Sequence, residues 1–309
     1  MTKKEPQFEI TDLEGRGYGL QPTPDDARDF ELNDVFGAPA SLDVPNEDFM
    51  VVAPLGIKDQ RASDMCTAFS LAAISEDQEG IALDPNFTFA MIKKMQGDWR
   101  GWGGDLRSGC KVATKIGFIE SGQNPFDYYK EGRNFVANWN NWPATMAPLA
   151  QIHRKESYFK VTGAFDVFDC LRQALWSNRG DKSSIYTGCI WRPGWTGSIG
   201  GIISKEVRTG GVGHAFKVFG QKMINDEPYL MVQNSFGADV GDAGVFYFPR
   251  EAVNRNFNFG AYMFKDMPKE EAKDILRGKG LLVELPQEKP FDLWDWIRGV
   301  FNKTKFSYA

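Results

Sequence analysis

Three segments of the sequence carry residues whose types and spacing could support acyl transfer by a thiol. Cys66 begins a nearly all-apolar run after a polar stretch, which would place its thiol in the first turn of a buried helix. Unpaired amides and the helix dipole favour an anion there and lower the pKa of a thiol. Gln60 lies six residues upstream, and its side-chain amide can donate hydrogen bonds toward the same point. Cys66 is therefore a candidate nucleophile.

Two later segments supply a base and an orienting amide. A glycine-rich loop ending at Gly213 delivers His214 to the start of an apolar strand, and a second strand ends at Asn234. A thiol with an ordinary pKa of about 8.5 is mostly protonated at neutral pH, so it needs a base or a cation beside it. His214 can take the proton, and Asn234 can hold the imidazole in the useful tautomer. The other histidine, His153, has basic neighbours that favour a surface position.

These residues resemble those of the papain-like cysteine peptidases. The matching motifs are Gln-x5-Cys with Ala-Phe two residues later, Gly-His-Ala opening a strand, and Asn-Ser-aromatic-Gly closing the next hairpin. The order and separation of cysteine, histidine and asparagine also agree, as does the Gly103-Gly104 pair followed by a helix ending at Gly117. These features cover roughly residues 40 to 265. The tract 24–30 looks like the entry segment of bacterial and phage-type members without a classical propeptide.

The resemblance implies a role for each matching position. Cys66 would be the nucleophile, His214 the base that later protonates the leaving amine, and Asn234 the residue that orients His214. The Gln60 amide and the backbone N–H of Cys66 would form the oxyanion hole. Residues that would contact the substrate or shield the histidine–asparagine hydrogen bond from water are Gly103, Gly104, Gly213 and Phe236.

The sequence departs from the family pattern beside the reacting groups. Papain has a disulfide-bonded cysteine three residues before its nucleophile, and Ser63 stands there in this chain, which agrees with a reducing compartment. The tryptophans that usually follow the nucleophile and the Asn-Ser pair are Thr67 and Phe236. Neither change removes a reacting group, but both leave the substrate preference open.

The elements that must position these groups change character along the chain. Helices are expected over 66–74, 85–95, 106–115 and 167–177, with a polar terminator at 76–80. Strands are expected over 158–161, 184–191, 215–219, 229–233, 245–249 and 260–264, with a short edge strand or buried entry segment at 50–55. This order predicts an α+β, papain-like two-lobed fold: a helical N-terminal lobe, an antiparallel β-barrel-like C-terminal lobe, and the active-site cleft between them.

The predicted domain organisation has three parts. They are an extended N-terminal arm over 1–40, a peptidase domain over 41–265 with a helical lobe at about 57–125 and a β lobe at about 155–265, and a C-terminal extension over 266–309. Within the extension, residues 291–301 form an amphipathic pattern behind Pro290 and predict a helix that could contact a protein partner. A free tail is the alternative for the arm, and the sequence leaves open whether the arm regulates the cleft.

Composition narrows the class of protein. The 309 residues are 42% apolar and 14% aromatic, as in globular proteins, and the net charge of −5 without a basic block argues against nucleic-acid partners. No signal peptide and no run of roughly 20 apolar residues is present, so we expect a cytoplasmic protein without a transmembrane segment. A virion or another large assembly is the alternative location. We expect no cofactor and no metal site, and we interpret the remaining cysteines as buried packing residues: Cys110, Cys170 and Cys189.

These observations predict a cysteine-type endopeptidase, a hydrolase that cleaves peptide or protein substrates through a thioester acyl-enzyme. One alternative keeps the fold but makes the protein an assembly component whose arm and tail dock on partners. Another uses the same triad for acyl transfer or for hydrolysis of peptidoglycan stem peptides, because the acyl-enzyme chemistry is shared.

Overall fold

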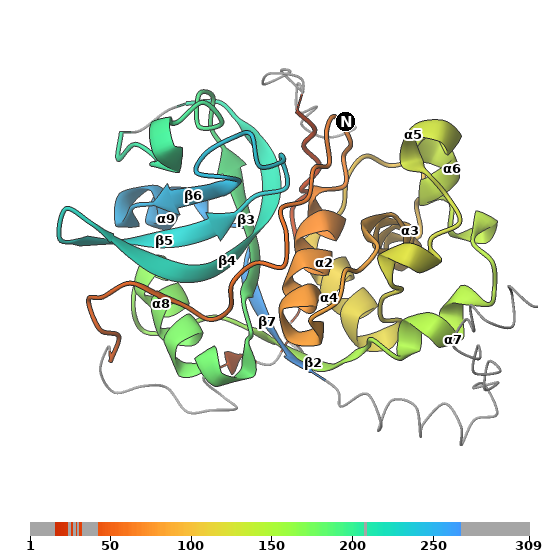
Figure 1. Cartoon of the computed structure of the whole chain (residues 1–309), viewed down its shortest axis with the longest axis horizontal. Coiled ribbons are helices and arrows are strands. Elements are labelled where there is room, and N and C mark those ends of the chain that lie inside the picture. The colour runs from red at the N-terminus through yellow and green to blue at the C-terminus, as the bar shows by residue number, and fades with distance from the viewer. Residues whose placement is uncertain are drawn as a thin grey trace, which may run out of the picture.

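The computed structural model describes residues 16–23, 26, 29, 31–32, 43–206 and 209–266. Most of the predicted arm, the C-terminal extension beyond residue 266 and its helix at 291–301 lie outside these ranges. In the described part, helices precede an antiparallel sheet and lie mostly to one side of it (Figure 1). The predicted α+β class is therefore confirmed.

The helical lobe is built around α2 (Cys66–Glu79), which begins at Cys66 as predicted and is buried from Cys66 to Asp77. Helices α3 (Pro85–Gln96) and α4 (Leu106–Lys115) pack against α2, and both match the predicted ranges. The side chains of Asp84 and Asp105 cap them by accepting a hydrogen bond from a backbone N–H of the first turn. Shorter helices that the sequence analysis did not predict complete the lobe: α5 (Tyr128–Glu131), α6 (Arg133–Ala137), α7 (Met146–Gln151), η1 (Ser121–Gln123) and η2 (Trp139–Asn141).

The β lobe is a seven-stranded sheet in the order β2-β7-β3-β4-β5-β6, with β1 added on β4. Its strands are β1 (Phe49–Met50), β2 (Lys155–Lys160), β3 (Ile185–Trp191), β4 (Val212–Ile224), β5 (Glu227–Gln233), β6 (Val245–Phe248) and β7 (Ala261–Asp266). All its pairings are antiparallel. Helices α8 (Val167–Ser177) and α9 (Arg250–Asn256) contact the sheet, while η3 (Arg179–Asp181) and η4 (Ile199–Gly201) lie in connections. The predicted strands between residues 158 and 264 and the helix α8 are thus confirmed, and α9 was not predicted. The edge strand or buried entry segment expected over 50–55 is wrong, because pairing with β4 ends at Met50 and both Met50 and Leu55 are exposed.

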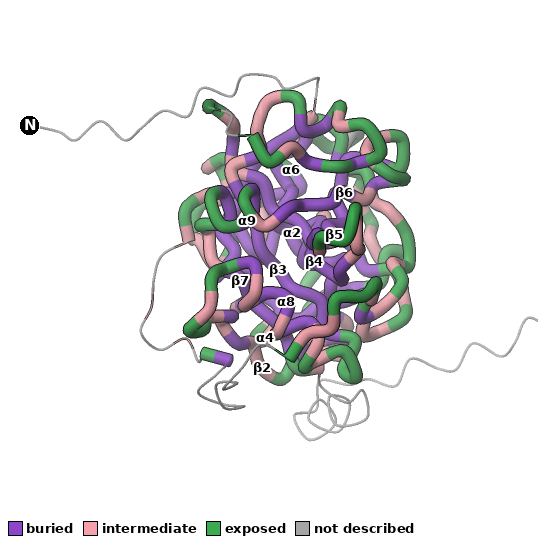
Figure 2. The backbone as a smooth tube through the Cα atoms, turned by 90° about the vertical axis from the view of Figure 1, so that its left-hand side faces the viewer, coloured by how far each residue is buried: buried purple, intermediate pink, exposed green. Residues whose placement is uncertain are grey.

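Each lobe has its own hydrophobic core. One cluster fills the β lobe around Trp191, Phe216 and Phe248. The other gathers the apolar faces of α2, α3 and α4 and reaches across to Tyr186 and Ala215 on the sheet. Figure 2 shows that α2 and the strands β3 and β4 are buried at the centre of the molecule. The interface between helix and sheet, where Cys66 begins α2, is therefore enclosed.

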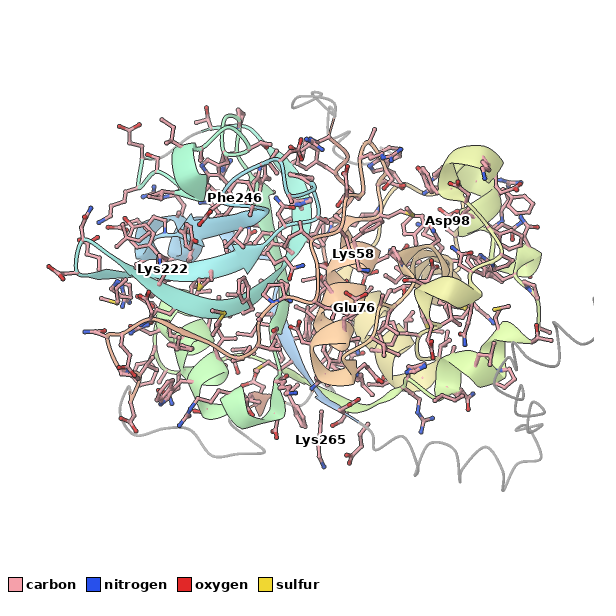
Figure 3. All side chains as sticks on the ribbon, in the orientation of Figure 1. Lys58, Glu76, Asp98, Lys222, Phe246 and Lys265 are labelled. Atoms are coloured by element: carbon pink, nitrogen blue, oxygen red, sulfur yellow. The ribbon has the colours of Figure 1, made fainter. Side chains whose placement is uncertain are left out.

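The acidic end of α2 differs from the prediction. A terminator was expected at 76–80, but the helix continues to Glu79 and ends at Gly80, whose φ of 71° is left-handed. Lysines from three other segments pair with the inward-facing acids, which lets the helix continue. Figure 3 labels one such pair, Glu76 on α2 and Lys58 beside it. The pairs are Lys58–Glu76 at 2.7 Å, Lys217–Asp77 at 2.8 Å and Lys155–Glu79 at 3.2 Å.

Two predictions about single residues are wrong. His153 is buried rather than on the surface, because its Nδ1 lies 3.0 Å from a carboxylate oxygen of Glu79, an acid that is itself turned inward. Cys170 is only half-buried, since it lies on α8 at the edge of the β-lobe core, whereas Cys110 and Cys189 are buried as predicted. All four cysteines are free.

Lys217 offers a stability test, because it joins helix α2, which begins at Cys66, to strand β4, which carries His214. Its ammonium and the Asp77 carboxylate are almost inaccessible, and Ser184 donates a further hydrogen bond to Asp77. Burial lowers the pKa of Lys217 and raises that of Asp77, and the ion pair opposes both shifts. We expect Lys217→Met to lower the free energy of unfolding by about 3–5 kcal/mol, because it leaves a buried carboxylate unpaired.

Urea unfolding checks this expectation. The matched control is Lys222→Met on the same strand, whose ion pair with Asp48 is exposed and should cost no more than about 1 kcal/mol. The double variant Lys217→Met/Asp77→Leu should recover much of the loss. Equal losses for the two lysine variants would contradict this account.

Candidate active site

Cys66 is the first residue of α2, and its side chain is fully buried. Burial raises the pKa of the thiol to about 12, while the backbone N–H groups of Ala215, Gly19 and Thr67, which bond to the sulfur, act to lower it. The lowering of the thiol pKa expected at a helix start is present, because the Thr67 N–H bonds to the sulfur, but the increase caused by burial is larger. The expectation of a lowered thiol pKa is therefore wrong for this closed form, in which the thiol is protonated.

His214 and Asn234 are brought together by the β4–β5 hairpin, in which Lys217 pairs with Gln233. The imidazole Nε2 lies 2.7 Å from Asn234 Oδ1. That oxygen also accepts a hydrogen bond of 2.6 Å from the backbone N–H of Ser235, which fixes it as an acceptor. Nε2 must therefore carry the proton, and the basic lone pair belongs to Nδ1.

The second ring nitrogen of the imidazole is free to act as a base. His214 Nδ1 is buried and has no hydrogen-bond partner among the described residues. The next residue, Ala215, donates its N–H to the Cys66 sulfur, so the strand that carries His214 meets the thiol at this point. Burial lowers the pKa of His214 to about 4, and the hydrogen bond to Asn234 opposes that shift. The imidazole is therefore neutral in this form at neutral pH.

Aromatic rings enclose the histidine. Phe236 stacks on His214 with centroids 4.5 Å apart and planes inclined by 26°, as expected for a residue that shields the histidine–asparagine hydrogen bond. Trp191 meets His214 edge-on at 5.4 Å, and Tyr18 does so at 5.3 Å. Neither of these two was predicted as part of the site. The pairing of β3 with β4 places Trp191 there, and that pairing could not be read from single motifs.

Gln60 is fully buried, and its side-chain amide is fixed from both ends. The amide oxygen accepts a hydrogen bond from the Ser235 hydroxyl. The amide nitrogen donates to two backbone carbonyls, those of Ser63 and Gly17, each at 2.9 Å. A peptide carbonyl from the N-terminal arm therefore lies on the predicted oxyanion donor.

Residues 16–21 of the arm run between the two lobes (Figure 1) and bond to Arg61 and Gly104 of one lobe and to Gly213 of the other. The segment is held like a bound peptide, by backbone hydrogen bonds on both sides. They are Gly17 N to Arg61 O at 2.7 Å, Gly104 N to Gly19 O at 2.8 Å, Gln21 N to Gly104 O at 2.9 Å and Leu20 N to Gly213 O at 3.0 Å. The indole N–H of Trp102 donates to the Tyr18 carbonyl at 2.8 Å. Gly104 and Gly213, two predicted substrate contacts, thus bind the arm.

The arm fits because two of its residues lack a side chain. A Cβ atom on Gly17 would lie 1.9 Å from the Ser63 carbonyl oxygen, and one on Gly19 would lie 2.0 Å from the Asp64 carbonyl oxygen. Neither distance can be tolerated without movement of the backbone. Leu20 is buried, and a Cβ on Gly188 would lie 2.3 Å from its side chain. The cleft thus accepts an aliphatic side chain at the Leu20 position.

The structure brings the predicted catalytic set and most predicted substrate contacts to one cleft. Gly103 also lies against the arm, because a Cβ atom on it would come within 1.8 Å of the Gly19 carbonyl oxygen. Its amide bonds to the Asp64 carboxylate and its carbonyl to Lys93, so it forms no backbone hydrogen bond with the arm. Among the described residues, no cluster of His, Cys, Asp or Glu side chains could hold a metal ion, and no helix is long and apolar enough to cross a bilayer.

Acid is expected to loosen the arm. The pKa of His214 is about 4 in the closed form, against an ordinary 6.5. Between these two pH values a solvated imidazole binds a proton and the buried imidazole does not. Arm docking is then strongest above pH 6.5 and weakens by up to about 1.4 kcal/mol per unit as pH falls toward 4. Hydrogen exchange of residues 16–21, corrected for the intrinsic rate, should show lower protection at pH 5 than at pH 7. Equal protection in the wild type, or the same pH dependence in His214→Gln, would contradict this.

Comparison with known proteins gives the fold. No protein-family model matches the sequence, and no curated protein matches it. Among solved structures, xylellain, a cysteine protease from Xylella fastidiosa, is similar with a TM-score of 0.67 and 22% identity over 84% of this chain and 99% of that one. The digestive procathepsin L2 proteinase of Tenebrio molitor larval midgut gives a TM-score of 0.60 and 16% identity, over 83% and 79% of the two chains. The procathepsin B S9 of Trypanosoma congolense gives 0.55 and 15%, over 83% and 88%.

The chain therefore has the papain-like cysteine protease fold, which confirms the predicted fold class. The identities are low, so the likeness concerns the fold. The roles of individual residues rest on the geometry of the site.

Proposed function

We propose that the protein is a cysteine-type endopeptidase whose cleft is closed by its own N-terminal arm. The observation that supports this proposal best is a peptide segment in the cleft, with its Gly17 carbonyl on the Gln60 amide and its Gly19 N–H on the Cys66 sulfur. The cleft is thus shaped to bind an extended peptide across a buried thiol. The fold is that of cysteine proteases, which supports the same activity.

In the proposed reaction, His214 Nδ1 takes the thiol proton and the Cys66 sulfur attacks the carbonyl carbon of a bound peptide. The Gln60 amide and a backbone N–H stabilise the oxyanion, and one such donor is typically worth about 10²–10³ in rate. The C–N bond then breaks as His214 returns the proton to the leaving amine, which leaves a thioester on Cys66. A water that gives its proton to His214 attacks the thioester, and the acid product leaves as the thiol is restored.

Asn234 has a positioning role in this scheme. Its carboxamide oxygen holds the Nε2 proton of His214, so Nδ1 stays the basic nitrogen throughout. Phe236 covers one face of the imidazole and keeps water from that hydrogen bond. Both residues act on His214 alone.

The arm would keep the enzyme inactive while it occupies the cleft. It blocks Gln60, binds both polar groups of Gly104 and buries the thiol and the imidazole in their neutral forms. Activity then requires that residues 16–21 leave the cleft. We also propose a cytoplasmic location, and the four free cysteines, which agree with a reducing compartment, support it.

A variant that displaces the arm tests the proposal without shortening the chain. Gly19→Val puts a side chain against the Asp64 backbone and should expel the arm. This variant should cleave a library of extended peptides, whereas Gly19→Val/Cys66→Ala should cleave none. If Cys66 reacts with iodoacetamide but no peptide is cleaved, acyl transfer or hydrolysis of peptidoglycan stem peptides becomes the better hypothesis. If Cys66 stays unreactive, the role as an assembly component is favoured.

A further inference from the structure

Three charged side chains hold the glycine-rich loop at 99–104 by hydrogen bonds to its backbone. Asp64 is two residues before Cys66 and is fully buried, Lys93 of α3 is 2% exposed, and the Arg133 side chain of α6 is 16% exposed. The Arg133 guanidinium binds the Asp64 carboxylate at 2.8 Å and lies over the Phe89 ring at 5.4 Å. None of these three side chains belongs to the proposed reacting set, yet all three bind the same loop.

Arg133 fixes the first half of this loop. Its guanidinium donates to the backbone carbonyls of Trp99 at 2.7 Å and of Gly101, in addition to its contact with Asp64. A planar guanidinium with several donors can bind such a set of oxygens at once, whereas a lysine ammonium cannot match that geometry. Arg133 therefore connects the loop to the segment that leads into Cys66.

Asp64 and Lys93 fix the second half. The Asp64 carboxylate accepts the Gly103 N–H at 2.6 Å, and the Lys93 ammonium donates to the Gly103 carbonyl at 2.9 Å. Both backbone polar groups of Gly103 are thus taken up by charged side chains. The next residue, Gly104, is left with its N–H and C=O directed to the cleft, where they bond to Gly19 and Gln21 of the arm at 2.8 and 2.9 Å.

We propose that Arg133, Asp64 and Lys93 form a positioning cluster that holds Gly104 in the orientation in which its backbone binds a peptide substrate. The inference rests on the proposed peptidase function and adds to it the residues that set substrate binding. They act through Gly104 and touch neither the substrate nor the reacting atoms. Charged hydrogen bonds to backbone suit this purpose, because they are stronger and more directional than neutral ones.

The test uses Arg133→Met and the milder Arg133→Lys, each in the Gly19→Val chain. Two backbone hydrogen bonds from Gly104 should weaken, so KM for extended peptides is expected to rise on the order of 10- to 100-fold. The limiting rate of iodoacetamide reaction at Cys66, measured at high pH where the thiol is ionised, should not change, because this small reagent needs no contact with Gly104. The pH midpoint of that reaction is not used as a control, because Arg133→Met leaves the Asp64 charge, which acts on the thiol, without its partner. Arg255→Met, at an exposed arginine on α9, is the matched control and should leave KM unchanged.

A second measurement does not require peptidase activity. With Gly19 intact, Arg133→Met should weaken the hydrogen bonds between Gly104 and the arm, so Cys66 should be labelled several-fold faster than in the wild type. If Gly19→Val cleaves no peptide, the proposed function fails, and this labelling experiment still decides the inference. The inference is overturned if KM and arm-dependent labelling both stay within twofold of the control. It is also overturned if Arg133→Lys and Arg133→Met slow the iodoacetamide reaction and kcat in parallel without a change in KM, which is the behaviour of a merely structural residue.

Discussion

Replacing Gly19 with valine is expected to raise the rate of Cys66 labelling and of peptide cleavage by about 100-fold or more. The arm is held by several backbone hydrogen bonds, each worth about 0.5–1.5 kcal/mol, so together they can hold the cleft closed by this factor. A Cβ on Gly19 would lie 2.0 Å from the Asp64 carbonyl oxygen, a contact that the arm can relieve only by leaving. The initial rate of cleavage of a fluorogenic peptide measures the effect.

The matched control is Gly197→Val. Gly197 lies in an exposed loop, and an added Cβ there would have no neighbour within 4 Å. This variant should remain as closed as the wild type. Activity that is equal in the Gly19→Val, Gly197→Val and wild-type chains would show that the arm does not control access to the thiol.

Removing the imidazole should abolish turnover in a chain whose cleft is open. In the Gly19→Val background, His214→Ala is expected to lower kcat/KM by about 10²–10⁴, the usual contribution of a general base. His214 is the assigned base because its Nδ1 is the basic ring nitrogen and has no hydrogen-bond partner among the described residues. Steady-state kinetics with the same peptide measures this loss.

A companion substitution separates this chemical role from packing. Asn234→Ala removes the carboxamide but leaves the ring, so it should reduce kcat less than His214→Ala and change the pH profile. The melting temperatures of the two variants and the parent chain are compared, so that a general loss of stability is excluded. Residual activity in His214→Ala equal to that of the parent chain would contradict the assigned base.

The residues of the candidate site could be predicted because each belongs to a short motif with local meaning. Cys66 ends a polar stretch where an apolar helix begins, and β4 and β5 place His214 and Asn234 on one hairpin. Gln60 could be placed for the same reason, six residues from the thiol. Local sequence patterns therefore identified the site before the strands were paired.

The closed cleft could not be predicted, because it depends on contacts between segments distant in sequence. The glycines of the arm have meaning only beside the backbone of Ser63 and Asp64, some 45 residues later, and beside Gly104. No local sequence motif indicates that these backbone segments approach each other closely. The raised thiol pKa follows from this burial and was missed for the same reason.

The inward-facing acids of α2 were misread on similar grounds. A run such as Glu76 to Glu79 reads as solvent-exposed unless its partners are known, and those partners come from β2, β4 and the loop before the helix. Burial of His153 depends on one of these acids, Glu79. The positioning cluster at Asp64, Lys93 and Arg133 likewise joins three segments that no single pattern connects.

The most direct test of the central claim is labelling with an epoxysuccinyl probe at neutral pH, followed by peptide mapping. Three chains are compared: the wild type, Gly19→Val, and Gly19→Val/His214→Ala. If the arm closes the cleft and His214 activates the thiol, the wild type is labelled slowly, Gly19→Val is labelled fast at Cys66 alone, and the double variant loses that reaction. The result that contradicts this prediction is a Gly19→Val chain in which Cys66 reacts no faster than Cys110, Cys170 or Cys189.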